Sequence, residues 1–111
     1  MRYISIFTHK PRNTPPDQQE IAAMTKLVEE GKKEGWLVTT EGVAWGDKGT
    51  IVRSTDGKLS VTDGPFAEAK EVIGGYAIMQ VKSHEEVLAL TRRFLAVAGD
   101  GTCELHQLFE M

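Results

Sequence analysis

The residues best suited to chemistry lie in the segment Asp63-Gly64-Pro65-Phe66. A proline fixes its own φ angle, so Pro65 stiffens the turn that presents the Asp63 carboxylate. A carboxylate held in this way can act as a general base or accept hydrogen bonds from a ligand. Asp63 is therefore a candidate catalytic residue, and Gly64, Pro65 and Phe66 are candidate ligand-binding residues of the same loop.

Two further charged residues, Glu68 and Lys70, follow this segment closely. With Glu71 they would bring a carboxylate, an ammonium group and a second carboxylate near Asp63, so Glu68 and Lys70 are also candidate ligand-binding residues. The alternative is a solvated helical turn. Opposite charges three or four residues apart stabilise a helix by roughly a few tenths of a kcal/mol, so stability alone is a weak reason for their presence.

The same segment has an equally physical structural explanation. An aspartate at a turn accepts hydrogen bonds from backbone N–H groups two or three residues further on. Gly64 would then supply an unusual dihedral angle, and Pro65 would set φ for the first position of a helical turn. An Asp63 carboxylate that points into a pocket favours the functional role, whereas one saturated by its own backbone favours the structural role.

His106 is the second candidate catalytic residue. Alternation along a strand predicted at 102–109 places His106 on the same face as Glu104, and the same argument places Ser5 of the first strand beside them. A histidine next to a carboxylate can titrate near neutral pH and act as an acid or a base. The alternative is a histidine at the rim of an interface that makes one hydrogen bond.

The remaining histidines and the single cysteine favour ordinary roles. His9 belongs to a proline-containing loop, His84 faces water at the start of a helix, and Cys103 is a small buried hydrophobe. These residues lack the H-x₃-H or C-x₂-C spacing of metal ligands, so the sequence predicts no metal site. The glycines match no phosphate-binding loop, so no nucleotide cofactor is predicted either.

Composition limits the class of protein. With 111 residues, 41% hydrophobic and 26% charged, the chain is expected to form one globular domain. A compact fold of 12.3 kDa has an accessible surface of roughly 6,000 Å². The net charge of −3 disfavours nucleic acid and anionic lipid as partners. One cysteine and the absence of a long apolar run predict a cytoplasmic protein outside the membrane.

Local signals predict the elements that must hold these residues. Capping boxes at Asp17-Gln18-Gln19-Glu20 and Ser83-His84-Glu85-Glu86 begin two amphipathic helices, and Gly35 and Gly99 end them. Asp56-Gly57 supplies the positive φ angles of a two-residue hairpin turn. The predicted elements are a strand at 2–8, a helix at 16–33, a strand at 36–43, a hairpin at 50–55 and 58–62, a turn with one helical turn at 63–71, a strand at 76–81, a helix between 83 and 99 and a strand at 102–109.

This order predicts an α+β, ferredoxin-like split βαβ fold: an antiparallel sheet with both helices on one face. The other face must then be polar, bind something or meet another subunit. The side chains expected to face the helices are Ile4, Ile6, Cys103 and Leu105. Those expected on the open face are Tyr3, Ser5, Phe7, Glu104 and His106. Such a mixture of aromatic and polar groups suits a homodimer interface with a pocket.

The string Val61-Thr62-Asp63-Gly64-Pro65-Phe66-Ala67-Glu68-Ala69-Lys70-Glu71 closely resembles the signature of YCII-related proteins of the DGPF-domain type. The resemblance extends to Met1-Arg2-Tyr3, Thr40-Glu41-Gly42, Gly74-Gly75-Tyr76 and Phe109-Glu110, so the whole chain is expected to be a single domain of this kind. The resemblance implies a ferredoxin-like protomer, a dimeric α+β barrel in which two sheets face each other, and a bacterial origin.

The resemblance implies no particular reaction. Members are often encoded near, or fused to, sigma factors of the extracytoplasmic-function class. One branch of the superfamily is proposed to use a histidine and an aspartate, but the helix after Asp17 contains no histidine. We predict a bacterial homodimer that binds or acts on a small molecule in a cleft beside the Asp63 loop. The alternative is a non-catalytic interaction module with a sigma-factor-related protein as its partner.

Overall fold

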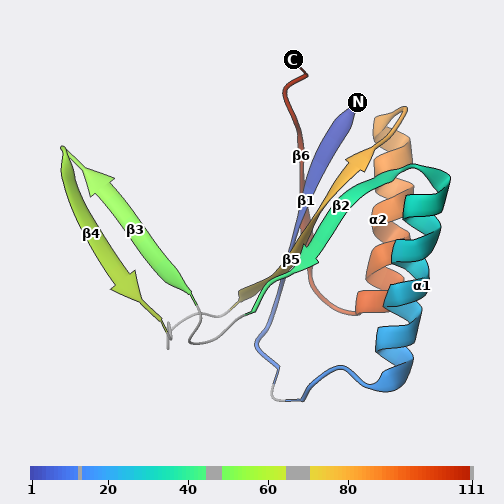
Figure 1. The fold of residues 1–111 in the computed structure, drawn as a ribbon, viewed down its shortest axis with the longest axis horizontal. Helices are drawn as coiled ribbons and strands as arrows, with labels where there is room; N and C mark the ends of the chain where they lie inside the picture. The colour runs from blue at the N-terminus through green and yellow to red at the C-terminus, as the bar shows by residue number, and fades with distance from the viewer. Residues whose placement is uncertain (13, 45–48, 65–70, 111) are drawn as a thin grey trace.

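The computed structural model describes all residues except 13, 45–48, 65–70 and 111. It is an α+β fold with two helices and antiparallel strand pairing, consistent with the predicted ferredoxin-like class (Figure 1). Its elements are β1 (Arg2–His9), α1 (Gln18–Glu34), β2 (Leu37–Gly42), β3 (Thr50–Thr55), β4 (Lys58–Asp63), β5 (Val72–Gln80), α2 (His84–Ala98) and β6 (Thr102–Gln107). In the part of the chain described, no helix is both long and apolar enough to cross a membrane.

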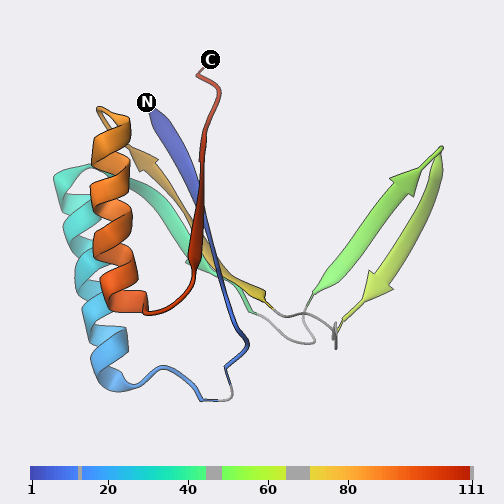
Figure 2. The same cartoon turned by 180° about the vertical axis from the view of Figure 1, so that it is seen from behind.

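The main sheet has four strands in the order β2-β5-β1-β6, and each neighbouring pair is antiparallel. Both helices cover the same face of this sheet, and within the described residues the opposite face carries no helix (Figures 1 and 2). The β3–β4 hairpin lies between β2 and β5 in the sequence and forms a separate two-stranded sheet. This architecture leaves one sheet face open, as the sequence predicts.

The helix ends follow the local chemistry of the sequence. The Asp17 carboxylate accepts a hydrogen bond from the Glu20 N–H at 2.8 Å, which caps α1. Ser83 caps α2 in the same way, with its hydroxyl accepting from the Glu86 N–H at 3.1 Å. Gly35 ends α1 at φ 88°, a left-handed conformation that glycine adopts without a Cβ penalty. Both predicted helices are therefore confirmed to within a few residues.

The core lies between the sheet and the two helices. Leu27 of α1 is buried, and a cluster of further buried residues comes from the sheet, from the residue after β5 and from α2, with Val87 fully shielded from solvent. They are Tyr3, Leu37, Met79, Val81, Val87 and Leu90. Val28 of α1 and Leu105 of β6 pack against this cluster, so Leu105 faces the helices as predicted. The core therefore ties both helices to the sheet.

The predicted facing of β1 is wrong. Tyr3 and Ser5 are each only 8% exposed, on the helix side, and the Phe7 ring meets Phe94 of α2 edge-to-face. Ile4 and Ile6 therefore lie on the open face. Strand alternation fixes which residues share a face, but the chain context decides which face is inside. β1 carries aromatic side chains on one face and aliphatic side chains on the other, so the apolar pattern alone does not show which face packs against the helices.

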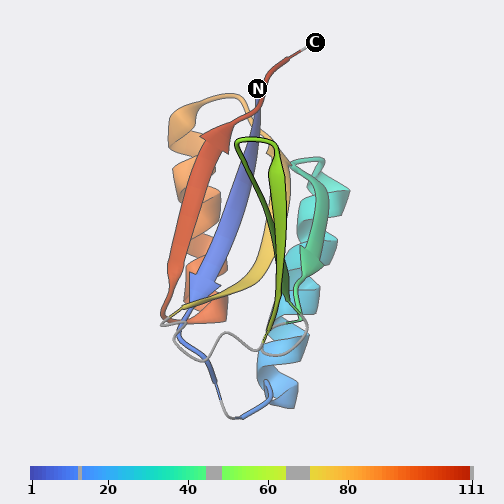
Figure 3. The same cartoon turned by 90° about the vertical axis from the view of Figure 1, so that its left-hand side faces the viewer.

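The β3–β4 hairpin, residues 50–63, is called the arm below. Its turn is made by Asp56 at φ 52° and Gly57 at φ 79°, as the Asp-Gly dipeptide predicts. The arm projects on the side of the main sheet opposite to the helices (Figures 1 and 3). Most of the predicted helical turn at 63–71 lies outside the described residues, and β5 begins at Val72, earlier than predicted.

Candidate functional site

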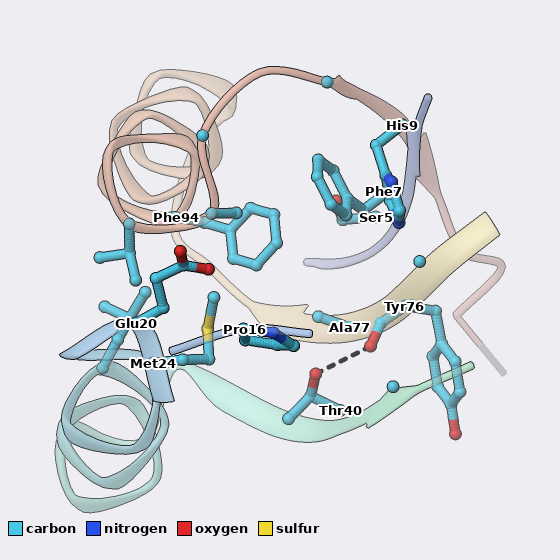
Figure 4. A pocket seen from close by; sticks show the side chains of 18 of the residues that line it. Ser5, Phe7, His9, Pro16, Glu20, Met24, Thr40, Tyr76, Ala77 and Phe94 are labelled. Atoms are coloured by element: carbon cyan, nitrogen blue, oxygen red, sulfur yellow. Dashed lines mark hydrogen bonds between the residues drawn. The ribbon is translucent and has the colours of Figure 1, made fainter. Parts of the chain in front are cut away.

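A cavity of about 1420 Å³ lies between the helices and the inner face of the main sheet. Figure 4 shows its walls: Ser5, Phe7 and His9 come from β1, Glu20 and Met24 from α1, and Thr40 from β2. Ala77 and Tyr76 of β5, Phe94 of α2 and Pro16, which precedes α1, are labelled there as well. The cavity therefore joins side chains from five elements that are distant in sequence.

The aromatic wall of the cavity is a short stack of rings. Phe7 stacks on the His9 ring at 5.4 Å between centroids with 29° between the ring planes, and it also makes an edge-to-face pair with Phe94 at 5.0 Å. Such contacts fix ring orientation beyond what simple burial provides. A Cβ added at Gly74 would come within 2.6 Å of the His9 ring, so β5 is glycine where it passes the stack. The wall is thus a preformed apolar surface.

Polar groups accompany this wall. The Glu20 carboxylate in the cavity lining lies 3.3 Å from the Arg12 guanidinium, and Glu71 accepts a hydrogen bond from the Thr8 hydroxyl at 3.5 Å. The Thr40 hydroxyl donates to the Tyr76 carbonyl at 2.8 Å, as the dashed line in Figure 4 marks. The site therefore combines aromatic surface with carboxylate acceptors, an arrangement that suits a ring compound carrying hydrogen-bond donors.

The Cys103 thiol is half-buried in β6. Burial raises its pKa, and the hydrogen bond with Ser5 offsets this effect only in part. Because the thiolate is the nucleophilic form, a raised pKa lowers reactivity at neutral pH. This agrees with the prediction that Cys103 fills space on the inner face of the sheet rather than acting as a nucleophile.

Asp63, the first candidate catalytic residue, lies at the end of β4. Its carboxylate accepts a hydrogen bond from the Thr50 hydroxyl at 2.9 Å across the arm, and both side chains are exposed. The Gly64 N–H donates to the Gly49 carbonyl at 2.8 Å and closes the base of the arm. Within the described residues the partner of the Asp63 carboxylate is thus a side-chain hydroxyl, and residues 65 and 66, whose N–H groups the structural explanation invokes, lie outside them.

The other candidates in this segment, Pro65, Phe66, Glu68 and Lys70, lie outside the described residues. Glu71, which directly follows them, is part of the cavity lining. The predicted loop therefore leads in sequence to the rim of the cavity. Its role as a ligand-binding loop stays a prediction.

His106 lies on the open face and not in the cavity. Its Nε2 is 3.1 Å from a Glu104 carboxylate oxygen, and both side chains are more than half exposed. The register pairs His106 with Ile4 and Glu104 with Ile6, which places all four on the same face. Ser5 lies on the opposite face, so the predicted group of His106, Glu104 and Ser5 is not brought together. A catalytic role for His106 stays a prediction.

The model of the YCII-related domain matches residues 1–111, the full length of the chain. The chain belongs to the YCII-related family. No curated protein matches its sequence significantly. The family membership predicted from residues 61–71 is therefore confirmed.

Sequence reasoning missed the cavity of this YCII-related protein. Phe94 and Met24 lie in the two amphipathic helices, and helical spacing alone does not distinguish a cavity wall from a packed core. Phe7 was expected on the open face. One available signal was the glycine pair at 74–75, since residues without side chains in a β-rich run mark a place where other groups approach closely. α1 contains no histidine, and the histidine that lines the cavity is His9 of β1.

Proposed function

We propose that this YCII-related protein binds a small ring compound in the cavity between the helices and the sheet. The observation that carries the proposal is the cavity itself, with the Phe7 and Phe94 rings already fixed against each other on its wall. Preformed, largely apolar concavities with a few polar groups are the usual form of small-molecule sites. A ligand would place its ring on this wall.

The polar groups suggest which compounds bind best. Glu20 and Glu71 are acceptors, and both belong to the cavity lining. A ring that carries an amine or hydroxyl group can donate to them, whereas a carboxylate would have to reach Lys10 or Arg12, of which Arg12 already pairs with Glu20. Asp63 is not part of this lining, so a role for Asp63 in binding stays a prediction. Whether the bound compound reacts, with Asp63 or His106 as the acid or base, stays a prediction.

Replacing Phe94 tests this proposal. A thermal-shift screen of neutral, amine-bearing and carboxylate-bearing ring compounds identifies ligands, and calorimetric titration gives their Kd values. We expect Phe94→Ala to weaken binding by at least about tenfold, because one aromatic contact of the wall is lost. Phe109→Ala is the matched control, since Phe109 is 98% exposed and lies outside the cavity lining.

The proposal fails if no ring compound binds, or if hits bind the Phe94→Ala and Phe109→Ala variants equally well. We also propose a cytoplasmic location, which the single cysteine supports.

The alternative function, a non-catalytic interaction module, has one observation in its favour. The arm exposes Val52, Leu59 and Val61, each more than 60% accessible. Contiguous apolar surface of this kind is typical of protein contact sites. The proposal of a sigma-factor-related protein as the partner rests on the family resemblance.

A further inference from the structure

The arm has two chemically different faces. The register pairs Val52 with Val61 and Ser54 with Leu59, and paired residues of an antiparallel ladder project to the same side. Val52, Leu59 and Val61 therefore share one face, where they are 62%, 74% and 65% exposed. The opposite face carries Ile51, Arg53, Thr55, Lys58, Ser60 and Thr62. The arm is thus an amphipathic ribbon whose apolar face lies in solvent.

Such a ribbon is not a stable unit on its own. A single two-stranded hairpin is at best marginally stable in water, and stable hairpins pack an apolar face against another layer. The arm forms its own two-stranded sheet, separate from the four strands of the main sheet. We therefore expect the apolar face of the arm to pack against another protein surface.

The dimensions of the whole chain indicate how large the missing contact is. The accessible surface is 8368 Å², compared with roughly 6,100 Å² for a compact monomer of this mass. The radius of gyration is 15.9 Å, compared with about 13 Å for a compact chain of this length. The excess of roughly 2,300 Å² exceeds the approximately 800 Å² that each partner buries in a standard interface. Counted for two copies, the excess is roughly 4,600 Å², within the roughly 2,000–5,000 Å² of total area that obligate homodimers bury.

The open face of the main sheet offers a second apolar surface on the same side as the arm (Figures 1 and 3). By register, Ile4 lies beside Ile78 and Ile6 beside Tyr76. These four half-buried side chains form its centre, and Glu104 and His106 lie at one edge. Arm and open face therefore border a common side of the molecule that carries no helix.

We propose that the apolar face of the arm packs against a second copy of this chain, and that the two copies exchange arms around a two-fold axis. Each copy then gives one arm and receives one, so the contact is closed and self-complementary. A homodimer through the open faces is already expected from the family resemblance. The new part of the proposal is that each arm packs against the other copy, a contact that a dimer formed by the open faces alone would not contain.

This arrangement gives Asp63 a defined place. Thr50 and Asp63 form a pair two residues along from Val52 and Val61, so they share the apolar face of the arm. Their hydrogen bond lies at the base of that face. In the dimer the Asp63 carboxylate therefore sits at the margin of the contact between copies.

The test uses two neighbouring residues of β4 that point to opposite faces. Val61→Asp puts a charge on the apolar face, and Ser60→Asp puts the same charge on the polar face; both wild-type residues are exposed. Sedimentation velocity over a concentration series gives the dimer Kd of each full-length protein. We expect Val61→Asp to raise this Kd at least tenfold over wild type, and Ser60→Asp to leave it within about twofold.

A second pair and a second measurement keep the result interpretable. Leu59→Asn and Thr62→Asn repeat the comparison without adding charge, and far-UV circular dichroism shows whether each variant is folded. Hydrogen exchange of the arm amides should become faster on dilution of the wild type, because dissociation uncovers the arm. The proposal is overturned if the wild type is a monomer at 100 µM, even if the arm amides of that monomer are protected from hydrogen exchange. It is also overturned if folded variants of both faces dimerise alike.

Discussion

At the scale of single residues, the chemistry that the sequence singles out at Asp63 has a concrete structural partner. The pairing of Asp63 with Thr50 follows from the Asp56-Gly57 turn, because a two-residue turn sets the register of the whole arm. This contact could thus be predicted from local chemistry. The cavity could not, since it arises where residues from five distant elements meet.

Asp63→Asn tests whether this residue is structural. The asparagine keeps an oxygen that can accept the Thr50 hydroxyl, and the pair is exposed, so we expect the free energy of unfolding to fall by less than about 1 kcal/mol. Urea unfolding followed by circular dichroism measures the change. Thr50→Val, which removes the donor, is the companion variant. A loss of about 2 kcal/mol or more for Asp63→Asn would assign the carboxylate to stability instead of function.

At the scale of elements, features that depend on neighbouring residues in the sequence could be predicted, whereas features that depend on contacts between distant elements could not. The helix caps at Asp17 and Ser83 and the arm turn depend on neighbours in sequence, and all three are confirmed. The facing of β1 depends on which side the helices take. The apolar pattern does not decide this for a strand with Tyr3 and Phe7 on one face and Ile4 and Ile6 on the other. Because the facing of β1 was predicted wrongly, Ser5 and Phe7 were not expected to line the cavity.

The ring stack between β1 and β5 requires a residue without a side chain at Gly74. This glycine lies at the register shift between the two strands, and a Cβ there would come within 2.6 Å of His9 and 2.9 Å of Phe7. We expect Gly74→Ala to lower the free energy of unfolding by about 1–3 kcal/mol, the usual cost of overpacking. It should also weaken ligand binding, because the rings must move.

Gly42→Ala is the matched control for this variant. A Cβ at Gly42 would meet its nearest heavy atom at 4.0 Å, and its φ angle is not in the left-handed region, so we expect a change within about 0.5 kcal/mol. Chemical unfolding of the two variants side by side decides the question. Equal free energies of unfolding for Gly74→Ala and Gly42→Ala would contradict this expectation, because the ring stack would then accommodate a methyl group without loss of stability.

At the scale of the whole molecule, the two proposed contacts lie on opposite faces of the main sheet. The cavity lies on the helix side, and the arm projects from the open side. A dimer that covers the open face would therefore leave the cavity of each copy in place. It follows that Val61→Asp should alter dimerisation without abolishing ligand binding, and that Phe94→Ala should do the reverse.

The most direct test of the central claim is a two-dimensional amide NMR titration of the ¹⁵N-labelled protein with the strongest ring compound from the screen. The account predicts that the largest shift changes fall on the inner wall, at the amides of Ser5, Thr40 and Phe94, and that they saturate with the calorimetric Kd. Shifts confined to the arm and the open face, around Val61 and His106, would contradict it.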